Sequence, residues 1–304
     1  MSTNRSVRLR LAAALRAVRR ARLDSPTSPK DRSAGRSHLS SITDRPSYVE
    51  FCARAAVDPT VFKTFRREPI YVETLEHVTE AHGRQYLRII QRDSPHLLMD
   101  DWLQRAKAND QWGSPITYDY PGVGQISPVT IRYLKVLSDL ERLFGDLTGA
   151  RVVEIGVGYG GQARLILERW SVENYTMIDL PAVLRLAGRY LEKFRTYSAL
   201  EFRSPENLTP TQYDLCISNY AFSELSRDVQ DRYAGMAVAS ALRGYLTCNF
   251  FSDQFGVYSW TKEELGRLHV GSHWIPEEPV THEGNAILVW GDTSSASHYL
   301  TEDR

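Results

Sequence analysis

The spacing of apolar residues divides the chain into a helical first part and an alternating second part. Between residues 47 and 108, apolar positions recur at i, i+3, i+4 and i+7, as at Tyr48, Phe51 and Ala55. This spacing is typical of amphipathic helices that pack against a core. It predicts a helical cap, which together with the loop that follows it covers residues 46–125.

A second apolar face in the cap runs on both sides of Gly83, over residues 72–90, and predicts a further helix there. A loop rich in Pro and Gly is expected at residues 113–125, and it carries Tyr118 and Tyr120. Aromatic side chains in such a loop either stack on a sugar ring or fill a core, and the sequence leaves both open. The first alternative makes the two tyrosines candidate substrate-binding residues.

From residue 126 onward, short runs of β-branched and apolar residues alternate with helical patterns. Strands are expected at residues 152–155, 175–179, 199–202, 213–219 and 244–249, with two late strands near 271–275 and 286–290. Helices are expected at residues 128–144, 163–170, 180–194 and 228–242. Strands and helices that alternate and end in two adjacent strands predict an α/β, doubly wound, Rossmann-like sheet closed by an antiparallel pair.

Composition narrows the classes of partner. The 304 residues suit one α/β domain, residues 126–291, preceded by the smaller cap. Lys+Arg and Asp+Glu both number 37, so no net electrostatic field favours nucleic acid as a partner, and a small-molecule substrate is expected.

No apolar run approaches the length of a membrane span. Three cysteines in apolar runs argue against disulfides and a zinc site and indicate a reducing, cytoplasmic compartment. A homo-oligomer is compatible with the sequence.

The two ends of the chain lie outside this division. Residues 1–45 begin with an arginine-rich amphipathic piece and continue with a piece rich in Ser, Pro and Arg, which predicts disorder. A transit peptide and a membrane-surface helix are alternatives, but a frayed, solvated helix is the simpler interpretation. We expect this segment to be dispensable for chemistry, and residues 292–304 to form a C-terminal tail.

The strand expected at residues 152–155 runs directly into a glycine loop and then a helix. Gly156, Gly158 and Gly160 occupy the loop. Glycine lets the backbone turn sharply and approach a ligand, while the following helix points its free N–H groups toward that ligand. The stretch therefore predicts a ligand cradle.

Two cofactors match this cradle. Gly156, Gly158 and Gly161 satisfy the dinucleotide fingerprint, and Asp179 ends the next strand about 20 residues later, where an acid binds ribose hydroxyls. Glu154, expected to face the cradle, would repel a pyrophosphate but would suit an ammonium and a sulfonium. We therefore interpret the cradle as an S-adenosylmethionine site, with an NAD-dependent oxidoreductase and a non-catalytic binding protein of the same fold as the alternatives.

A polar and aromatic junction follows the strand expected at residues 213–219. It carries Asn219, Tyr220, Phe222 and Glu224. In an open parallel sheet, ligands bind at the carboxyl ends of the strands, so this junction and the glycine loop should line one crevice. Tyr220 and Phe222 are therefore candidate substrate-binding residues.

Several segments together resemble the sugar O-methyltransferase family, within the seven-stranded, class I S-adenosylmethionine-dependent methyltransferases. The resemblance covers about residues 46–291 and implies methyl transfer to a sugar hydroxyl of a glycosylated natural product, nucleotide sugar or polysaccharide. The matching segments are Ile126–Tyr133, Val153–Gln162, Ile178–Pro181, Ser218–Leu225, Arg243–Tyr245 and Asn285–Gly291.

The resemblance also implies which residues contact the cofactor: Tyr133, Glu154, Gly156, Gly158, Gly160, Gln162, Asp179, Leu180 and Asn219. A sugar hydroxyl is a poor nucleophile and needs a general base or a metal ion. Glu224 is our candidate catalytic base, and no metal ligand is assigned. The alternative for Glu224 is an acid in the first turn of the next helix, stabilised by the helix dipole. The histidines of the cap, His77, His82 and His96, are interpreted as surface or packing residues.

Overall fold

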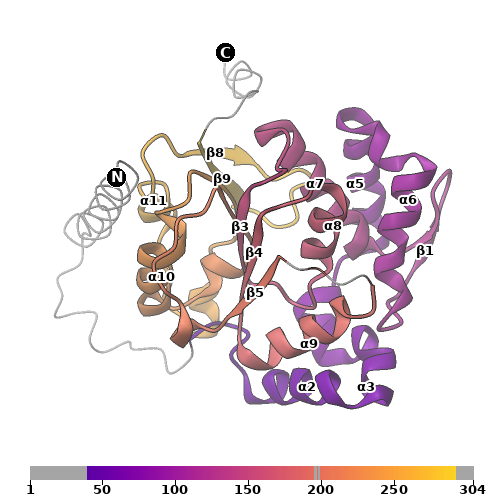
Figure 1. The fold of residues 1–304 in the computed structure, drawn as a ribbon, viewed down its shortest axis with the longest axis horizontal. Helices are drawn as coiled ribbons and strands as arrows, with labels where there is room; N and C mark the ends of the chain where they lie inside the picture. Colours follow the sequence, from indigo (N-terminus) through magenta and orange to yellow (C-terminus); the bar gives the residue numbers. More distant parts are fainter. Residues whose placement is uncertain (1–39, 195–196, 198, 292–304) are drawn as a thin grey trace.

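The computed structural model describes residues 40–194, 197 and 199–291 of the chain. At its centre is a seven-stranded sheet with helices on both faces (Figure 1). The strand order is β5-β4-β3-β6-β7-β9-β8. The strands are β3 (Arg151–Ile155), β4 (Asn174–Ile178), β5 (Leu200–Arg203), β6 (Leu215–Asn219), β7 (Arg243–Cys248), β8 (His273–Pro276) and β9 (Ala286–Trp290).

The sheet confirms the predicted fold class, a doubly wound, Rossmann-like α/β sheet closed by an antiparallel pair and preceded by helices. The strands from β5 to β7 run parallel, while β9 is antiparallel to both of its neighbours, β7 and β8. Each expected strand is present, with bounds within two residues of those expected. The strong β-branched runs explain this agreement, because strands buried on both faces are apolar along their whole length.

Helices cover the two faces of the sheet separately. The first face carries α7 (Pro128–Phe144), α8 (Gly161–Arg169) and α9 (Pro181–Leu191), and the second carries α10 (Arg227–Tyr233) and α11 (Lys262–Leu265). Alternate residues of one strand serve the two cores, as Val152 packs in the first and Val153 in the second. The helix expected at residues 228–242 is shorter than predicted. It gives way after Tyr233 to a π-helical turn, Ala234–Val238, that contains the poor helix former Gly235.

The cap consists of short helices packed on the first face. α2 lies against α9, and α5 lies against α7 (Figure 1). The elements are α2 (Pro46–Val57), α3 (Pro59–Thr64), η2 (Phe65–Arg67), α4 (Pro69–Tyr71), η3 (Val72–Glu76), α5 (Glu80–Asp93), η4 (Pro95–Leu98), α6 (Asp100–Lys107) and η5 (Ala108–Gln111). The expected cap is therefore confirmed as helical.

Two expectations for the cap need correction. The apolar face around Gly83 is not one helix, because α5 begins only at Glu80, where the Thr79 side chain accepts a hydrogen bond from the His82 N–H. The loop expected at residues 113–125 contains an antiparallel hairpin, β1 (Tyr118–Tyr120) and β2 (Gly124–Ile126). Glycines with positive φ at 122 and 124 allow the tight turn, which a count of turn formers alone does not reveal.

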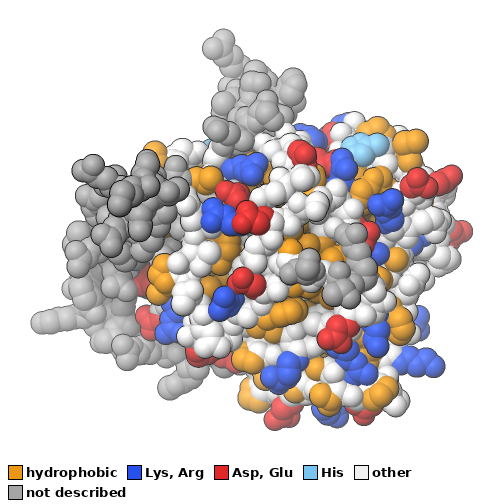
Figure 2. Space-filling model, in the orientation of Figure 1, with side chains coloured by type: hydrophobic (Ala, Val, Ile, Leu, Met, Phe, Trp, Pro, Cys, Tyr) orange, Lys and Arg blue, Asp and Glu red, His pale blue; other side chains and the backbone are white. Residues whose placement is uncertain are grey.

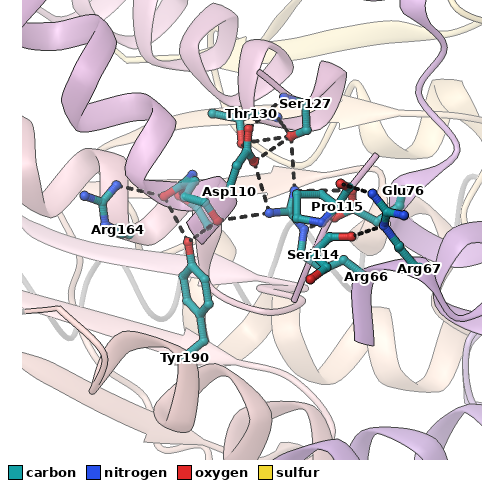
Figure 3. Close-up of polar contacts among 12 residues, drawn as sticks. Arg66, Arg67, Glu76, Asp110, Ser114, Pro115, Ser127, Thr130, Arg164 and Tyr190 are labelled. Carbon is teal, nitrogen blue, oxygen red and sulfur yellow. Dashed lines mark hydrogen bonds and ion pairs between the residues drawn. The ribbon is translucent and has the colours of Figure 1, made fainter. Parts of the chain in front are cut away.

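A buried polar junction connects the cap to the sheet domain (Figure 3). The fully buried Arg66 forms ion pairs with Glu76 at 2.5 Å and with Asp110 at 3.1 Å. Asp110 also accepts a hydrogen bond from the backbone N–H of Ser127 at 2.7 Å. Ser127 is the N-cap of α7, so this network fixes the start of the helix that precedes β3.

The same junction reaches the glycine loop. The Asn109 side-chain amide donates to the carbonyl oxygen of Gly161, the first residue of α8, at 3.1 Å. Arg164 and the Tyr190 hydroxyl both donate to the Asn109 side-chain oxygen, at 2.9 and 3.0 Å. Helices α8 and α9 are thus both anchored to the cap through Asn109.

Residues 40–45 form a strap along the connection between β6 and α10. Ser41 makes an isolated β-bridge with Leu225, the Ile42 N–H donates to the Glu224 carbonyl at 3.3 Å, and the Ser226 N–H donates to the Ser40 carbonyl at 2.8 Å. The strap therefore packs with the sheet domain, and a division of the chain at residue 45 separates it from the elements it contacts. The remainder of the basic segment, residues 1–39, lies outside the described residues.

The surface gives no sign of a single charged patch on the face shown in Figure 2. Acidic and basic side chains are interspersed there with apolar ones. This agrees with the equal numbers of acidic and basic residues in the sequence. Within residues 40–291, apart from the three that are not described, no helix is both long and apolar enough to cross a membrane.

Candidate functional site

A cavity of about 1090 Å³ lies at the carboxyl ends of β3, β4 and β6. Gly156, Asp179 and Asn219, which follow or end these three strands, all line it. The cap and the strap contribute the opposite walls. Sites for single small ligands usually occupy about 300–1,000 Å³, so this cavity has room for a cofactor and an acceptor together.

The structure brings half of the expected site residues into this one cavity. They come from the connections after three parallel strands, as expected for an open sheet. The residues are Gly156, Gly158, Asp179, Leu180, Asn219, Tyr220 and Glu224.

The glycine loop depends on glycine for backbone reasons. Gly156 has φ +80°, and a Cβ there would lie 2.0 Å from the Cβ of Ala221. Gly158 has φ +54°, and a Cβ would meet Leu75 of the cap at 3.0 Å. The close approach at these two positions is therefore to the β6 connection and to the cap, on either side of the cavity wall. Gly160 is the left-handed N-cap of α8 and does not line the cavity.

Asp179 lies directly under this loop. Its carboxylate accepts hydrogen bonds from the Gly158 N–H at 3.2 Å and from the Leu180 N–H at 2.7 Å. Burial raises the pKa of Asp179 to about 6, although backbone bonds from Leu180, Gly158 and Val157 lower it. A carboxylate has about four acceptor positions, so at least one remains for a ribose hydroxyl.

Glu224 ends the short 3₁₀ turn η7 (Ala221–Glu224) that follows β6. Its carboxylate accepts a hydrogen bond from the Asn249 side-chain amide at 2.5 Å. Burial raises the pKa of Glu224 to about 7, while the bond from Asn249 lowers it. The next helix, α10, begins at Arg227, and its first-turn acid is Asp228. Glu224 therefore lies before α10, and the helical element in whose first turn it stands is the 3₁₀ turn η7.

Tyr220 adopts a strained backbone at the end of β6. Its φ is +69°, which is uncommon for a bulky residue and is found preferentially at functional sites. Its hydroxyl donates to the buried Glu277, which also accepts from the Thr281 N–H at 2.8 Å and the Asn285 side-chain amide at 3.1 Å. This network ties the connection between β8 and β9 to the cavity.

Several cavity residues carry no local sequence pattern that marks them as part of a binding site. Arg132 comes from α7, and Tyr48, His77, His82 and Tyr86 come from the cap. Burial, followed by the charge of Arg132, lowers the pKa of His77 to about 4. The interpretation of His77 and His82 as ordinary surface or packing residues therefore overlooks that both line the cavity.

Glu154 does not face the cavity. Only 2% of its surface is exposed, and it accepts a hydrogen bond from the Tyr175 hydroxyl at 2.6 Å inside the domain. Burial raises its pKa to about 8, so its neutral form is favoured at pH 7. The expectation that Glu154 repels a pyrophosphate in the cradle is therefore wrong.

The other expected residues also lie outside the cavity wall. Gln162 donates to the Tyr133 carbonyl at 3.3 Å, which links α8 to α7. Phe222 is fully buried against Trp260 in the second core, with ring centroids 6.3 Å apart. These three side chains position the site but do not line it.

The two tyrosines of the hairpin do not reach the cavity either. Tyr120 is buried beside Gly83, and its hydroxyl donates to the Glu80 carbonyl at 3.3 Å. Tyr118 packs against the first core and is absent from the lining. Of the two open interpretations, core packing is the one that the structure supports. His96 is likewise remote, and its ring bonds to Glu141 at 2.9 Å.

Metal binding has no structural candidate among the described residues, since no group of three or more His, Cys, Asp or Glu side chains is placed to hold an ion.

Comparisons with known proteins give only the fold. No protein-family model matches the sequence, and no curated protein matches it. Solved structures with similar folds include the methyltransferase domain of bacterial CtHen1 (15% identity, 52% of this chain, 97% of the other, TM-score 0.40). They also include an S-adenosylmethionine-dependent methyltransferase from Mesorhizobium loti (18%, 34%, 48%, 0.28) and Haemonchus contortus phosphoethanolamine N-methyltransferase 2 in complex with S-adenosyl-L-methionine (17%, 60%, 43%, 0.37). Similarities at this level do not identify a substrate or a reaction for this chain.

Proposed function

We propose that the protein is an S-adenosylmethionine-dependent O-methyltransferase that acts on a sugar hydroxyl. The observation that carries this proposal is the presence, in one cavity, of the glycine loop, Asp179 and Glu224. A ribose-binding acid and a carboxylate with a pKa near neutrality then lie in the same two-ligand space.

The cofactor half of the cavity is formed by Gly156, Gly158 and Asp179. The remaining acceptor capacity of Asp179 suits the ribose, and Gly156 and Gly158 carry no side chain that would project into the cavity. When bound, S-adenosylmethionine supplies an electrophilic methyl group on a sulfonium. Positioning that methyl in line with the acceptor oxygen accounts for most of the rate enhancement expected of such a site.

Glu224 provides the proton acceptor. With a pKa raised to about 7, it is ionised in a substantial fraction of molecules at neutral pH and is still basic enough to take a proton. A bound S-adenosylmethionine would supply the methyl group, and Glu224 would take the proton that the acceptor hydroxyl loses. Glu224 would then release that proton to solvent.

Two unpaired amide oxygens support a polyhydroxylated acceptor. The side-chain oxygens of Asn249 and Asn285 are buried and have no hydrogen-bond partner among the described residues. Both residues line the cavity. A buried acceptor without a partner is costly, and sugar hydroxyls are donors of suitable size. The choice of a sugar also rests on the resemblance of the Ser218–Leu225 segment.

The NAD-dependent alternative now depends on topology, since Glu154 no longer argues against it. A dinucleotide-binding sheet of the 3-2-1-4-5-6 order is mostly parallel. Here the reversed strand β9 is inserted next to β7, which favours the methyltransferase reading. Calorimetry with S-adenosylhomocysteine and with NAD separates the two, and tight NAD binding without S-adenosylhomocysteine binding would refute the proposal.

Turnover is tested directly with methyl-labelled S-adenosylmethionine and a panel of glycosides, nucleotide sugars and glycosylated metabolites. We expect label in a sugar ether for at least one acceptor. Cofactor binding without transfer to any member of a broad panel would favour the non-catalytic binding protein instead.

A further inference from the structure

Arg132 lines the cavity, and the proposed reaction does not use its chemistry. It lies in the second turn of α7, after the N-cap Ser127 and the first-turn Pro128. Its neighbours Ile131 and Tyr133 are buried in the first core, whereas Arg132 lines the cavity. The helix thus directs one cation into the space between the sheet and the cap.

The guanidinium of Arg132 is held by aromatic rings. It lies 5.8 Å from the ring centroid of Tyr220 and 5.7 Å from that of Tyr133. Within the described part of the chain, no hydrogen bond or ion pair to this side chain is formed. A guanidinium has five N–H donors, so Arg132 presents an unused donor fork to the cavity.

Arg66 shows what a satisfied arginine looks like in the same region (Figure 3). Its donors reach both oxygens of Glu76, the Asp110 carboxylate and the Ser127 hydroxyl. Because Arg66 occupies both oxygens of Glu76, that carboxylate balances the charge of Arg132 only from a distance. The Arg132 donors therefore remain available.

The other ionisable groups near Arg132 do not compete for an anion or supply one. His77, with its pKa lowered to about 4, is neutral at pH 7, and His82 lines the cavity beside it. Tyr86 and Tyr220 are neutral phenols, since burial raises the pKa of both. Glu277 is already engaged by the Tyr220 hydroxyl. An incoming anion would thus meet a cation on a neutral, aromatic wall.

We propose that Arg132 is the carboxylate receptor of this cavity and binds a planar carboxylate through two parallel N–H donors. Two ligands can bring that group: the amino-acid end of the cofactor, in which case the inference rests on the proposed function, or an acidic acceptor such as a uronic acid. The chemistry is the same for both, and the source is an experimental question.

The test compares ligands that differ only in the carboxylate-bearing part. S-Adenosylhomocysteine and 5′-methylthioadenosine share the nucleoside, but only the first has the amino-acid end. Galacturonate and galactose form the matching acceptor pair. Affinities are measured by calorimetry on the full chain, for the wild type, Arg132→Gln, Arg132→Lys and the control Arg185→Gln, whose arginine is exposed on α9 away from the cavity.

We expect Arg132→Gln to weaken one carboxylate ligand about 10- to 100-fold and to leave its carboxylate-free partner unchanged, since charge-assisted bonds are lost. Arg132→Lys should lie between, because it keeps the charge but not the fork. Loss of S-adenosylhomocysteine affinity identifies the cofactor as the source, and loss of galacturonate affinity identifies the acceptor. The control should match the wild type.

Other outcomes overturn the inference. Equal weakening of S-adenosylhomocysteine and 5′-methylthioadenosine would show that Arg132 only supports the cavity, and unchanged affinity for all four ligands would show no role. A wild type that binds neither nucleoside ligand refutes the proposed function, yet a galacturonate preference that disappears in Arg132→Gln would still support the receptor. A wild type with no carboxylate preference in either pair refutes the receptor alone.

Discussion

Replacing Glu224 by Gln separates its catalytic role from its structural one. The substitution keeps the shape and the oxygen that accepts from Asn249, but removes the ability to take a proton. If Glu224 is the base, kcat should fall about 10²–10⁴-fold with cofactor affinity retained. The limb of the kcat/KM–pH profile with an apparent pKa near 7 should disappear with it.

The substitution Glu224→Gln, which should lower kcat, should raise the stability of the folded protein at high pH. Burial raises the pKa of Glu224 from its ordinary value of 4.5 to about 7, so the folded state holds the proton more tightly than the unfolded state. The stability from this proton is complete below pH 4.5 and is lost as pH rises through 7. This difference in pKa corresponds to about 3 kcal/mol, after a small reduction for partial exposure of the side chain.

Glu224→Gln should therefore be more stable than the wild type at pH 8 and nearly equal to it at pH 4.5. A gain of this size raises Tm by on the order of 5 °C for a domain of this length. The assays are initial rates across pH and thermal unfolding at both pH values, with the exposed Glu173→Gln as control. A fall in kcat of less than tenfold, or lower stability at pH 8, would refute the reasoning.

Two further substitutions and two deletions test the remaining assignments. Asp179→Ala should weaken S-adenosylhomocysteine binding by about 2–3 kcal/mol in calorimetry, because a carboxylate that holds two hydroxyls is lost; undiminished affinity contradicts the ribose assignment. Deleting residues 1–39 should leave kcat unchanged. Deleting residues 1–45 also removes the strap from the Glu224 carbonyl and admits water, so the apparent pKa of the acidic limb of the kcat/KM–pH profile should move from near 7 toward 4.5. Identical pH profiles for the two deletions would show that the strap does not shield the base. Arg66→Met leaves Glu76 and Asp110 buried without their cation and should cost about 3–5 kcal/mol in urea unfolding, and a loss below about 1 kcal/mol would contradict the role of the junction.

Local patterns were sufficient for the sheet and for the residues at strand ends. The runs that become β3, β4 and β6 are apolar and bounded by turn residues, and parallel strands bring their carboxyl ends to one edge whatever the details of packing. Gly156, Asp179 and Glu224 follow from this rule alone. Each lies in the cavity because its position along the chain places it at that edge.

The burial of Glu154 can also be predicted from the sequence, but from the alternation of side chains along the strand and not from the glycine-loop motif. Val152 and Glu154 are two residues apart, so they share the face covered by α7, α8 and α9, while Val153 faces the other core. Glu154 therefore points beneath the helices, where the Tyr175 hydroxyl meets it. The glycine-loop motif predicts that Glu154 contacts a ligand, but the alternation of side chains along the strand places it in the core.

The contributions of the cap and strap could not be predicted. The bridge between Ser41 and Leu225 joins residues far apart in sequence, and no periodicity encodes it. Arg132 lies within a helix most of whose other residues are buried, and only the placement of the cap shows that its side chain opens into a cavity. Long-range packing decides these contacts, whereas sequence spacing decides only local faces.

The charges of the cavity fit a cationic cofactor for a physical reason that links its two acids. Burial disfavours ionised Asp179 and Glu224, which raises the pKa of each. A positively charged ligand in the same cavity stabilises both carboxylates and lowers these pKa values again. Under the proposed function, a larger fraction of Glu224 would therefore be ionised when the sulfonium is present. A proton taken up by Glu224 would offset the loss of the sulfonium charge, so the net charge inside the cavity would be the same before and after the reaction.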